Sequence, residues 1–96
     1  GLPVAILDDS EYEDVTVQLE PGDRVYLFSD GVVEQTGPAG GEPFGRKRLV
    51  DLLLADHDKD LSHAVTHGMN ALADWAGGRR FQDDVSLVAL EWIRPR

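Results

Sequence analysis

The chain has no cysteine, a single methionine and few aromatic residues, which make up 7% of its 96 residues. Without cysteine it can form no disulfide framework, no thiolate nucleophile and no thiolate metal site. This absence fits a reducing compartment, so we expect the protein in the cytoplasm. Hydrophobic residues still make up 42% of the sequence, which is enough for a folded core.

Basic residues are also scarce, because 9 lysines and arginines stand against 18 aspartates and glutamates and leave a net charge of −9. Such a chain is repelled by the phosphates of nucleic acids and by anionic lipids, so we expect no nucleic-acid partner. No apolar run approaches the ~20 residues that a membrane-spanning helix needs, so we expect no membrane insertion. A glycine-rich phosphate loop is also missing, which argues against a nucleotide hydrolase.

The hydrophobic pattern predicts strands before helices. The predicted elements are strands at 4–7, 13–19, 24–29 and 84–93, and helices at about 44–55 and 60–76. Glu20-Pro21-Gly22-Asp23 is typical of a turn between two of these strands. Ser10 and Glu13 match a capping box, but because a strand is predicted there we interpret the match as a false positive. This order indicates an α+β fold, an antiparallel sheet with the two helices on one face.

Two carboxylate positions flank the two most apolar strands. Asp30 ends the strand at 24–29, and Asp83 and Asp84 precede the final strand. If these strands are antiparallel neighbours, the end of one lies beside the start of the other. Clustered carboxylates repel one another, so such a cluster calls for a cation, and its oxygen ligands favour Mg²⁺ or Mn²⁺. Spacing alone leaves the alternative open, an ordinary Asp-Gly turn and a solvated strand cap.

Five short segments also stand in a characteristic order. They are Gly1-Leu2-Pro3, Leu19-Glu20-Pro21-Gly22-Asp23, Phe28-Ser29-Asp30-Gly31-Val32-Val33-Glu34, Phe44-Gly45 and Gln82-Asp83-Asp84-Val85-Ser86. Together they resemble the bacterial PPM-type Ser/Thr phosphatases of the SpoIIE/RsbU group. The resemblance implies half of an α-β-β-α sandwich. It also implies hydrolysis of phosphoserine or phosphothreonine on a protein, usually a STAS-type anti-anti-sigma factor, in sigma-factor or stress signalling.

The resemblance assigns roles to particular positions. Asp30 and Asp83 match metal ligands of a site that holds two Mn²⁺ or Mg²⁺ ions in the complete domain, while Gly31 and Asp84 match supporting positions. No catalytic residue is assigned beyond these. The pair Arg79 and Arg80 precedes this site and offers candidate phosphate contacts, with ordinary loop charges near a helix end as the alternative.

The family's domain is about twice as long as this chain. We therefore expect residues 1–96 to be the C-terminal portion of a single domain, without the N-terminal half that supplies further metal ligands. By itself this portion is predicted to be inactive or nearly so. Its uncovered sheet edge leads to the hypothesis of a homodimer. Two alternatives stay open, a non-catalytic phosphatase-like regulatory module and an unrelated α+β binding domain.

The histidines and a basic cluster receive structural interpretations. His63 and His67 have the spacing of a two-histidine metal pair, but the glutamate of the known motif is missing, so we interpret them, with His57, as solvated surface. Arg46-Lys47-Arg48 is interpreted as the polar face of the first predicted helix.

Overall fold

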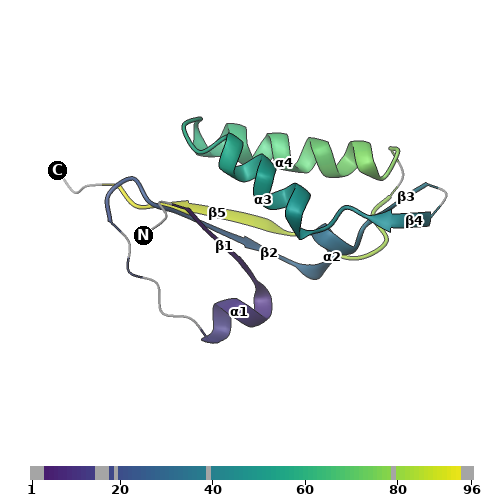
Figure 1. Ribbon diagram of the computed structural model, residues 1–96, viewed down its shortest axis with the longest axis horizontal. Coiled ribbons are helices and arrows are strands. Elements are labelled where there is room, and N and C mark those ends of the chain that lie inside the picture. Colours follow the sequence, from purple (N-terminus) through teal and green to yellow (C-terminus); the bar gives the residue numbers. More distant parts are fainter. Residues whose placement is uncertain (1–3, 15–17, 19, 39, 79, 94–96) are drawn as a thin grey trace.

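The computed structural model describes residues 4–14, 18, 20–38, 40–78 and 80–93. The elements in this part of the chain are β1 (Val4–Asp8), α1 (Asp9–Asp14), β2 (Arg24–Phe28), α2 (Asp30–Glu34), β3 (Thr36–Gly37), β4 (Gly40–Pro43), α3 (Arg46–Ala55), α4 (Leu61–Trp75) and β5 (Leu87–Glu91). Helices α3 and α4 lie together over one face of the sheet that contains β1, β2 and β5 (Figure 1). The predicted α+β class, with two helices on one face of a sheet, is confirmed.

Strand β2 is the middle strand of this sheet, whose order is β1-β2-β5. It pairs antiparallel with β5, so that Phe28 lies opposite Leu87. It pairs parallel with β1, so that Val4 lies opposite Arg24. The sheet is therefore mixed: the predicted antiparallel pairing is correct for β2 and β5, and it does not extend to β1.

Helix α1 accounts for the parallel pair, because parallel neighbours need a crossover connection instead of a tight hairpin. The Asp8 carboxylate accepts the N–H of Glu11 at 2.8 Å, and the Glu11 carboxylate accepts the N–H of Asp8 at 3.3 Å. This reciprocal capping box begins two residues before the match that we rejected. The predicted strand at 13–19 is wrong at Glu13 and Asp14, which end α1, and at Gln18, which lies in no strand; 15–17 and 19 lie outside the described residues.

The predicted turn before β2 and the predicted end of the second helix are confirmed. Asp23 donates its N–H to the carbonyl of Glu20 at 3.0 Å, and Gly22 between them has a φ of +92°, as the predicted turn requires. Helix α4 ends where Gly77 and Gly78 adopt φ values of +70° and +78°. The turn at Glu20–Asp23 sets the point at which the central strand begins.

The core lies between the sheet and the two covering helices. It consists of these buried side chains: Val4, Tyr26, Phe28, Val32, Phe44, Leu49, Leu53, Ala64 and Leu72. Small residues allow α4 to approach the sheet, since a Cβ added to Gly68 would lie 3.3 Å from the Leu87 side chain of β5. The inward face of α4 therefore follows Ala64, Gly68 and Leu72, whereas Val65 is only half-buried.

Strand β5 is shorter than predicted and is apolar on a face that solvent reaches. Leu87 and Ala89 pack against the core, whereas Val88 is 49% exposed and Leu90 is 53% exposed. The apolar sequence of this strand is therefore not matched by burial on both of its faces. The reason is that α3 and α4 cover only one face, and β5 lies at an edge of the sheet that the described residues form.

Arg24, the first residue of β2, is only 5% exposed and ties the sheet to the turn between α3 and α4. Its guanidinium donates to the Glu91 carboxylate at 2.9 Å, to the Tyr26 hydroxyl at 3.2 Å and to the Asp56 carbonyl at 3.3 Å. It also donates to the Lys59 carbonyl. Burial lowers the pKa of Arg24, but the hydrogen bonds to Glu91 and Tyr26 outweigh this effect and raise the pKa above the usual arginine value. The α3–α4 turn is thus anchored to the central strand.

We expect Arg24→Met to lower the free energy of unfolding by about 2–3 kcal/mol, because charge-assisted hydrogen bonds are lost and buried carbonyls lose their donor. Arg46→Met is the matched control: this arginine also pairs with a glutamate, but its side chain is 45% exposed. Its loss should cost less than about 1 kcal/mol. Urea denaturation measures both values, and equal losses would contradict the anchoring role of Arg24.

Candidate functional site

The segment that follows the end of β2, residues 29–31, contacts the segment that precedes the start of β5, residues 83–86 (Figure 1). We call this contact the β2–β5 junction. Ser29 donates its N–H to the Ser86 carbonyl at 3.0 Å. Its hydroxyl donates to the Asp84 carbonyl at 3.2 Å and accepts the N–H of Ser86 at 2.9 Å. One serine therefore holds the two segments side by side, which confirms their predicted proximity.

Gly31 brings the two segments into direct backbone contact. It is buried as the second residue of α2, and a Cβ at this position would lie 2.1 Å from the carbonyl oxygen of Asp84. Because that oxygen belongs to the backbone, it cannot rotate away, and only glycine fits. Helix α2, which begins with Asp30, therefore starts against the loop that carries Asp83 and Asp84.

Two glutamines extend this contact, and sequence reasoning did not identify either as a positioning residue. The buried Gln35 accepts the N–H of Gln82 at 2.9 Å through its side-chain oxygen. The Gln82 side chain in turn accepts the N–H and the hydroxyl of Thr36 at 2.8 and 3.0 Å. Gln82 stands inside a motif noted in the sequence, but no local pattern marks its partner Gln35. These hydrogen bonds hold Gln82, the residue before Asp83, against Gln35 and Thr36.

The three junction aspartates, Asp30, Asp83 and Asp84, are exposed to solvent. Asp83 accepts the N–H of Asp84 through Oδ1 at 2.8 Å, which orients its carboxylate. Asp83 also borders a hollow of about 270 Å³ together with Gly31, Glu34, Gln35 and Gln82. The donors here are carboxylate and carbonyl oxygens, so their chemistry fits a hard divalent cation such as Mn²⁺ or Mg²⁺.

The junction aspartates do not form a complete set of ligands. In the described part of the chain, a group of three side chains whose ligand atoms all lie within 4.8 Å of one another occurs elsewhere, at Asp56, His63 and His67. Both histidines are exposed, as predicted. The interpretation of the histidines as solvated surface did not include Asp56. That residue follows a different helix, and its position depends on how α3 and α4 pack.

The arginines predicted to contact phosphate are described only in part. Arg79 lies outside the described residues. Arg80 is exposed and borders a hollow of about 210 Å³ that Gln35, Thr36 and Gln82 also line. Since Gln35 and Gln82 border the junction hollow as well, Arg80 stands on the adjoining surface. Its contact with phosphate stays a prediction.

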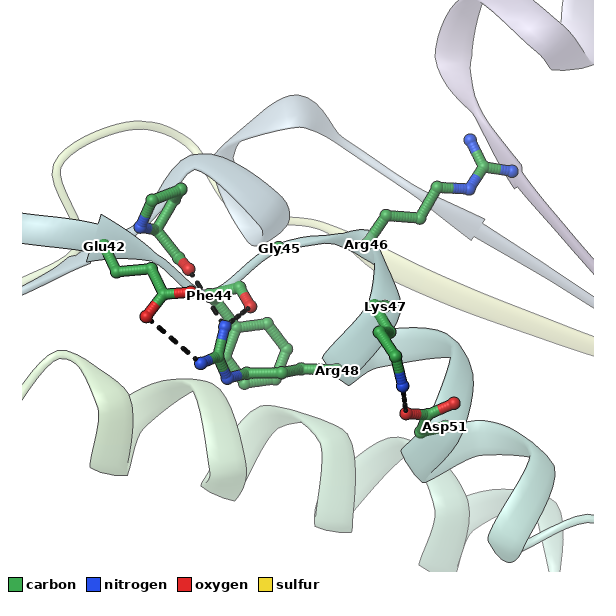
Figure 2. Close-up of a pocket in the computed structure, with 8 residues that line it drawn as sticks. Glu42, Phe44, Gly45, Arg46, Lys47, Arg48 and Asp51 are labelled. Carbon is green, nitrogen blue, oxygen red and sulfur yellow. Dashed lines mark hydrogen bonds and ion pairs between the residues drawn. The ribbon is translucent and has the colours of Figure 1, made fainter.

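A third hollow, at the start of α3, is lined by a basic cluster whose charges are paired within the protein (Figure 2). Arg48 donates to the Phe44 carbonyl at 2.9 Å, and its Nη2 lies 3.4 Å from the Glu42 carboxylate. Its guanidinium also lies 4.1 Å from the centre of the Trp75 ring. These contacts stabilise the packing of α3 against α4.

The other two cations of this cluster are also paired. Lys47 donates to the Asp51 carboxylate at 2.7 Å, four residues further along α3 (Figure 2). Arg46 points away from that pair in the figure and contacts Glu11, and its guanidinium holds the pKa of Glu11 below the usual range. The cluster is therefore explained by internal ion pairs, in agreement with its interpretation as a polar helix face.

Comparisons with known proteins identify one family and one solved structure that are similar to this chain. The SpoIIE family (stage II sporulation protein E) matches residues 1–93. Among solved structures, the SiaA-PP2C domain of Pseudomonas aeruginosa superposes with a TM-score of 0.70 at 29% sequence identity. That match covers 79% of this chain and 31% of the solved chain. No curated protein sequence matches the chain.

We expect Gly31→Ala to lower the free energy of unfolding by about 1–3 kcal/mol, because the new methyl group overlaps the Asp84 carbonyl. Alanine normally stabilises a helix relative to glycine by about 1 kcal/mol. A loss of stability in Gly31→Ala would therefore show that the contact with the Asp84 carbonyl outweighs this helix preference. Gly37→Ala is the control, since its nearest contact would be an ordinary 3.6 Å. A stabilised Gly31→Ala variant would contradict the close approach.

Proposed function

This chain belongs to the stage II sporulation protein E family of PPM-type phosphatases, and from that premise we propose that it forms part of an enzyme that hydrolyses phosphoserine or phosphothreonine on a protein. The observation that carries the proposal is the β2–β5 junction. There a serine, a tightly packed glycine and two glutamines hold Asp30 beside the loop of Asp83 and Asp84. An unrelated binding domain has no need for carboxylates placed this way.

We propose that Asp30 and Asp83 are metal ligands. Asp84 and Gly31 support them, Asp84 through the carbonyl that receives Ser29 and Gly31 through its contact with that carbonyl. Manganese or magnesium ions, when bound, supply an activated water and positive charge for the phosphoryl group. The chain's own part is to orient the Asp83 carboxylate, which the N–H of Asp84 fixes, and to present Arg80 to the substrate phosphate.

The substrate that we propose is a phosphorylated STAS-type protein, which would place the enzyme in sigma-factor or stress signalling in the cytoplasm. The family resemblance supports this proposal. In the described part of the chain, the helices fall short of the length and apolar character that a membrane crossing requires. The alternative is a non-catalytic phosphatase-like module. The aspartates favour catalysis, since a module without metal has no reason to hold Asp30 beside the loop of Asp83 and Asp84.

We further propose that residues 1–96 are the C-terminal portion of one phosphatase domain. Two observations support this proposal. The structural match extends over only 31% of the SiaA-PP2C chain. In addition, the junction aspartates do not by themselves gather a three-ligand group in the described part of the chain. The remaining ligands would come from other residues of the domain.

We expect Mn²⁺ to bind the chain weakly, and we expect Asp30→Asn and Asp83→Asn each to reduce its affinity by roughly tenfold or more, because each removes an anionic ligand. Asp51→Asn is the control, since this aspartate pairs with Lys47 on α3. Isothermal titration calorimetry measures the affinities. Equal Mn²⁺ affinity in the three variants would contradict the assignment of Asp30 and Asp83.

An activity assay complements the calorimetry. With Mn²⁺ and p-nitrophenyl phosphate, these 96 residues should show little or no turnover beside an intact domain of the family. Turnover comparable to that of the intact domain would contradict the proposal that the ligand set is incomplete.

The exposed edge of β5 supports the proposal of a homodimer. Its apolar residues include Val88 and Leu90, which are about half exposed, and Leu61 and Leu87 line a hollow beside it. An edge strand with apolar side chains readily pairs with another strand. The partner that we propose is therefore the same strand of a second copy.

We expect light scattering to show a mass that rises toward that of a dimer as the concentration increases. Leu90→Lys should keep the chain monomeric, because lysine on an edge strand blocks pairing. Leu54→Lys is the control, since Leu54 is 41% exposed on α3, a helix that lies over the sheet. A wild-type chain that stays monomeric at all concentrations would contradict the dimer.

A further inference from the structure

The turn between α3 and α4 gathers an aspartate and two histidines, which we call the Asp–His cluster (Asp56, His63 and His67). Asp56 is the residue that caps the end of α3, and it is only 6% exposed. His63 and His67 lie one turn apart on α4, with ring centroids 6.0 Å apart. Nδ1 of His67 lies 2.6 Å from Oδ2 of Asp56.

The backbone around Asp56 is fixed from both sides. Its N–H donates to the Leu52 carbonyl at 3.2 Å, and its carbonyl accepts the N–H of Lys59 at 2.9 Å. The same carbonyl accepts a hydrogen bond from the buried Arg24. The carboxylate is therefore presented to α4 from an anchored turn, and both histidines project from one helix. Such support is what a binding site needs in order to be preorganised.

The chemistry of these donors selects a transition metal. Two imidazoles and one carboxylate form a ligand set that suits zinc, and histidines four residues apart on a helix lie on one face. We propose that Asp56, His63 and His67 bind Zn²⁺, with a fourth position left for water or another small ligand. A hollow of about 310 Å³, lined by Thr66 and Asn70 as well as both histidines, gives room for that ligand.

Small side-chain movements suffice to form the site. Zinc ligands at ~2.0–2.1 Å from the metal lie roughly 3.3 Å from one another in a tetrahedron. The 2.6 Å pair of His67 and Asp56 opens when the metal replaces the proton between them, and the other separations, up to 4.8 Å, shorten. His63 is exposed, so its ring can rotate toward the metal without disturbing the core.

A simple hydrogen bond between His67 and Asp56 explains only part of this arrangement. That pair closes the turn by itself and does not involve His63, yet His63 offers its ligand atom within 4.8 Å of the other two. The role of His63 therefore separates a metal site from a structural hydrogen bond.

The Asp–His cluster is independent of the proposed phosphatase metals. It lies at the turn anchored by Arg24, the first residue of β2, whereas the β2–β5 junction follows the last residue of that strand (Figure 1). The two places also differ in chemistry, because the junction offers oxygen donors alone and the cluster offers two nitrogens.

Titration of the 96-residue chain with Zn²⁺ by calorimetry tests the proposal. We expect about one ion per chain, with visible d–d absorption when Co²⁺ is used in place of Zn²⁺. His63→Ala and His67→Ala should each weaken binding roughly tenfold or more, since even residues that only support a ligand change affinity by 10–100-fold. An Asp30→Asn, Asp83→Asn double variant should bind Zn²⁺ like the wild type.

His57→Ala is the matched control, because His57 lies in the same turn and donates from Nδ1 to the Leu54 carbonyl at 2.9 Å instead of facing the cluster. It should bind Zn²⁺ normally. Unchanged affinity in His63→Ala would overturn the proposal, and so would equal weakening in His57→Ala. Thermal unfolding without metal checks the variants, and His63→Ala should unfold at the wild-type temperature because the side chain is exposed.

Discussion

The structure depends on one central strand, β2, that is paired on both sides and fixed at both ends. Tyr26 and Phe28 fill the core beneath α3 and α4, so the strand is held by apolar burial as well as by its two neighbours. Its first residue, Arg24, reaches the turn between the helices. The residue after its end, Ser29, holds the loop before β5. Both candidate sites therefore include segments whose positions depend on a single strand.

Local sequence patterns predicted this strand, the turn before it and the two covering helices well. The apolar run at 24–29, the turn before it and both helices are confirmed, because each depends on neighbours along the sequence. The proximity of Asp30 to Asp83 and Asp84 was also predictable, since antiparallel pairing of the two most apolar strands brings an end beside a start. Metal binding by these aspartates stays a prediction. The oxygen donors gathered at the junction are consistent with it.

Features that depend on contacts distant in sequence were not predictable. The direction of β1 follows from the path of the chain through α1, and the capping residues Asp8 and Glu11 were hidden by a competing match two residues later. Burial of Asp56 depends on Arg24 and on the packing of α3 against α4. The histidine spacing on α4 was visible, but its meaning depends on a carboxylate that only the tertiary structure supplies.

The proposed dimer and the proposed metal site need different things from the residues around them. The dimer needs a second β5 strand, whereas the metal site at the junction needs further ligands. If two β5 strands pair antiparallel about a two-fold axis normal to the sheet, with the strands fully overlapped, Leu87 of one copy lies near Glu91 of the other. Because β5 rises ~3.4 Å per residue, the two junctions then stand about 14 Å apart along the strands. A dimer of this kind pairs the free edge of β5, yet it cannot give either junction the ligands of the other. If Asp30 and Asp83 bind metal as proposed, the coordination is therefore completed by residues other than a second copy of this strand, and the proposed dimer and the proposed catalysis do not depend on each other.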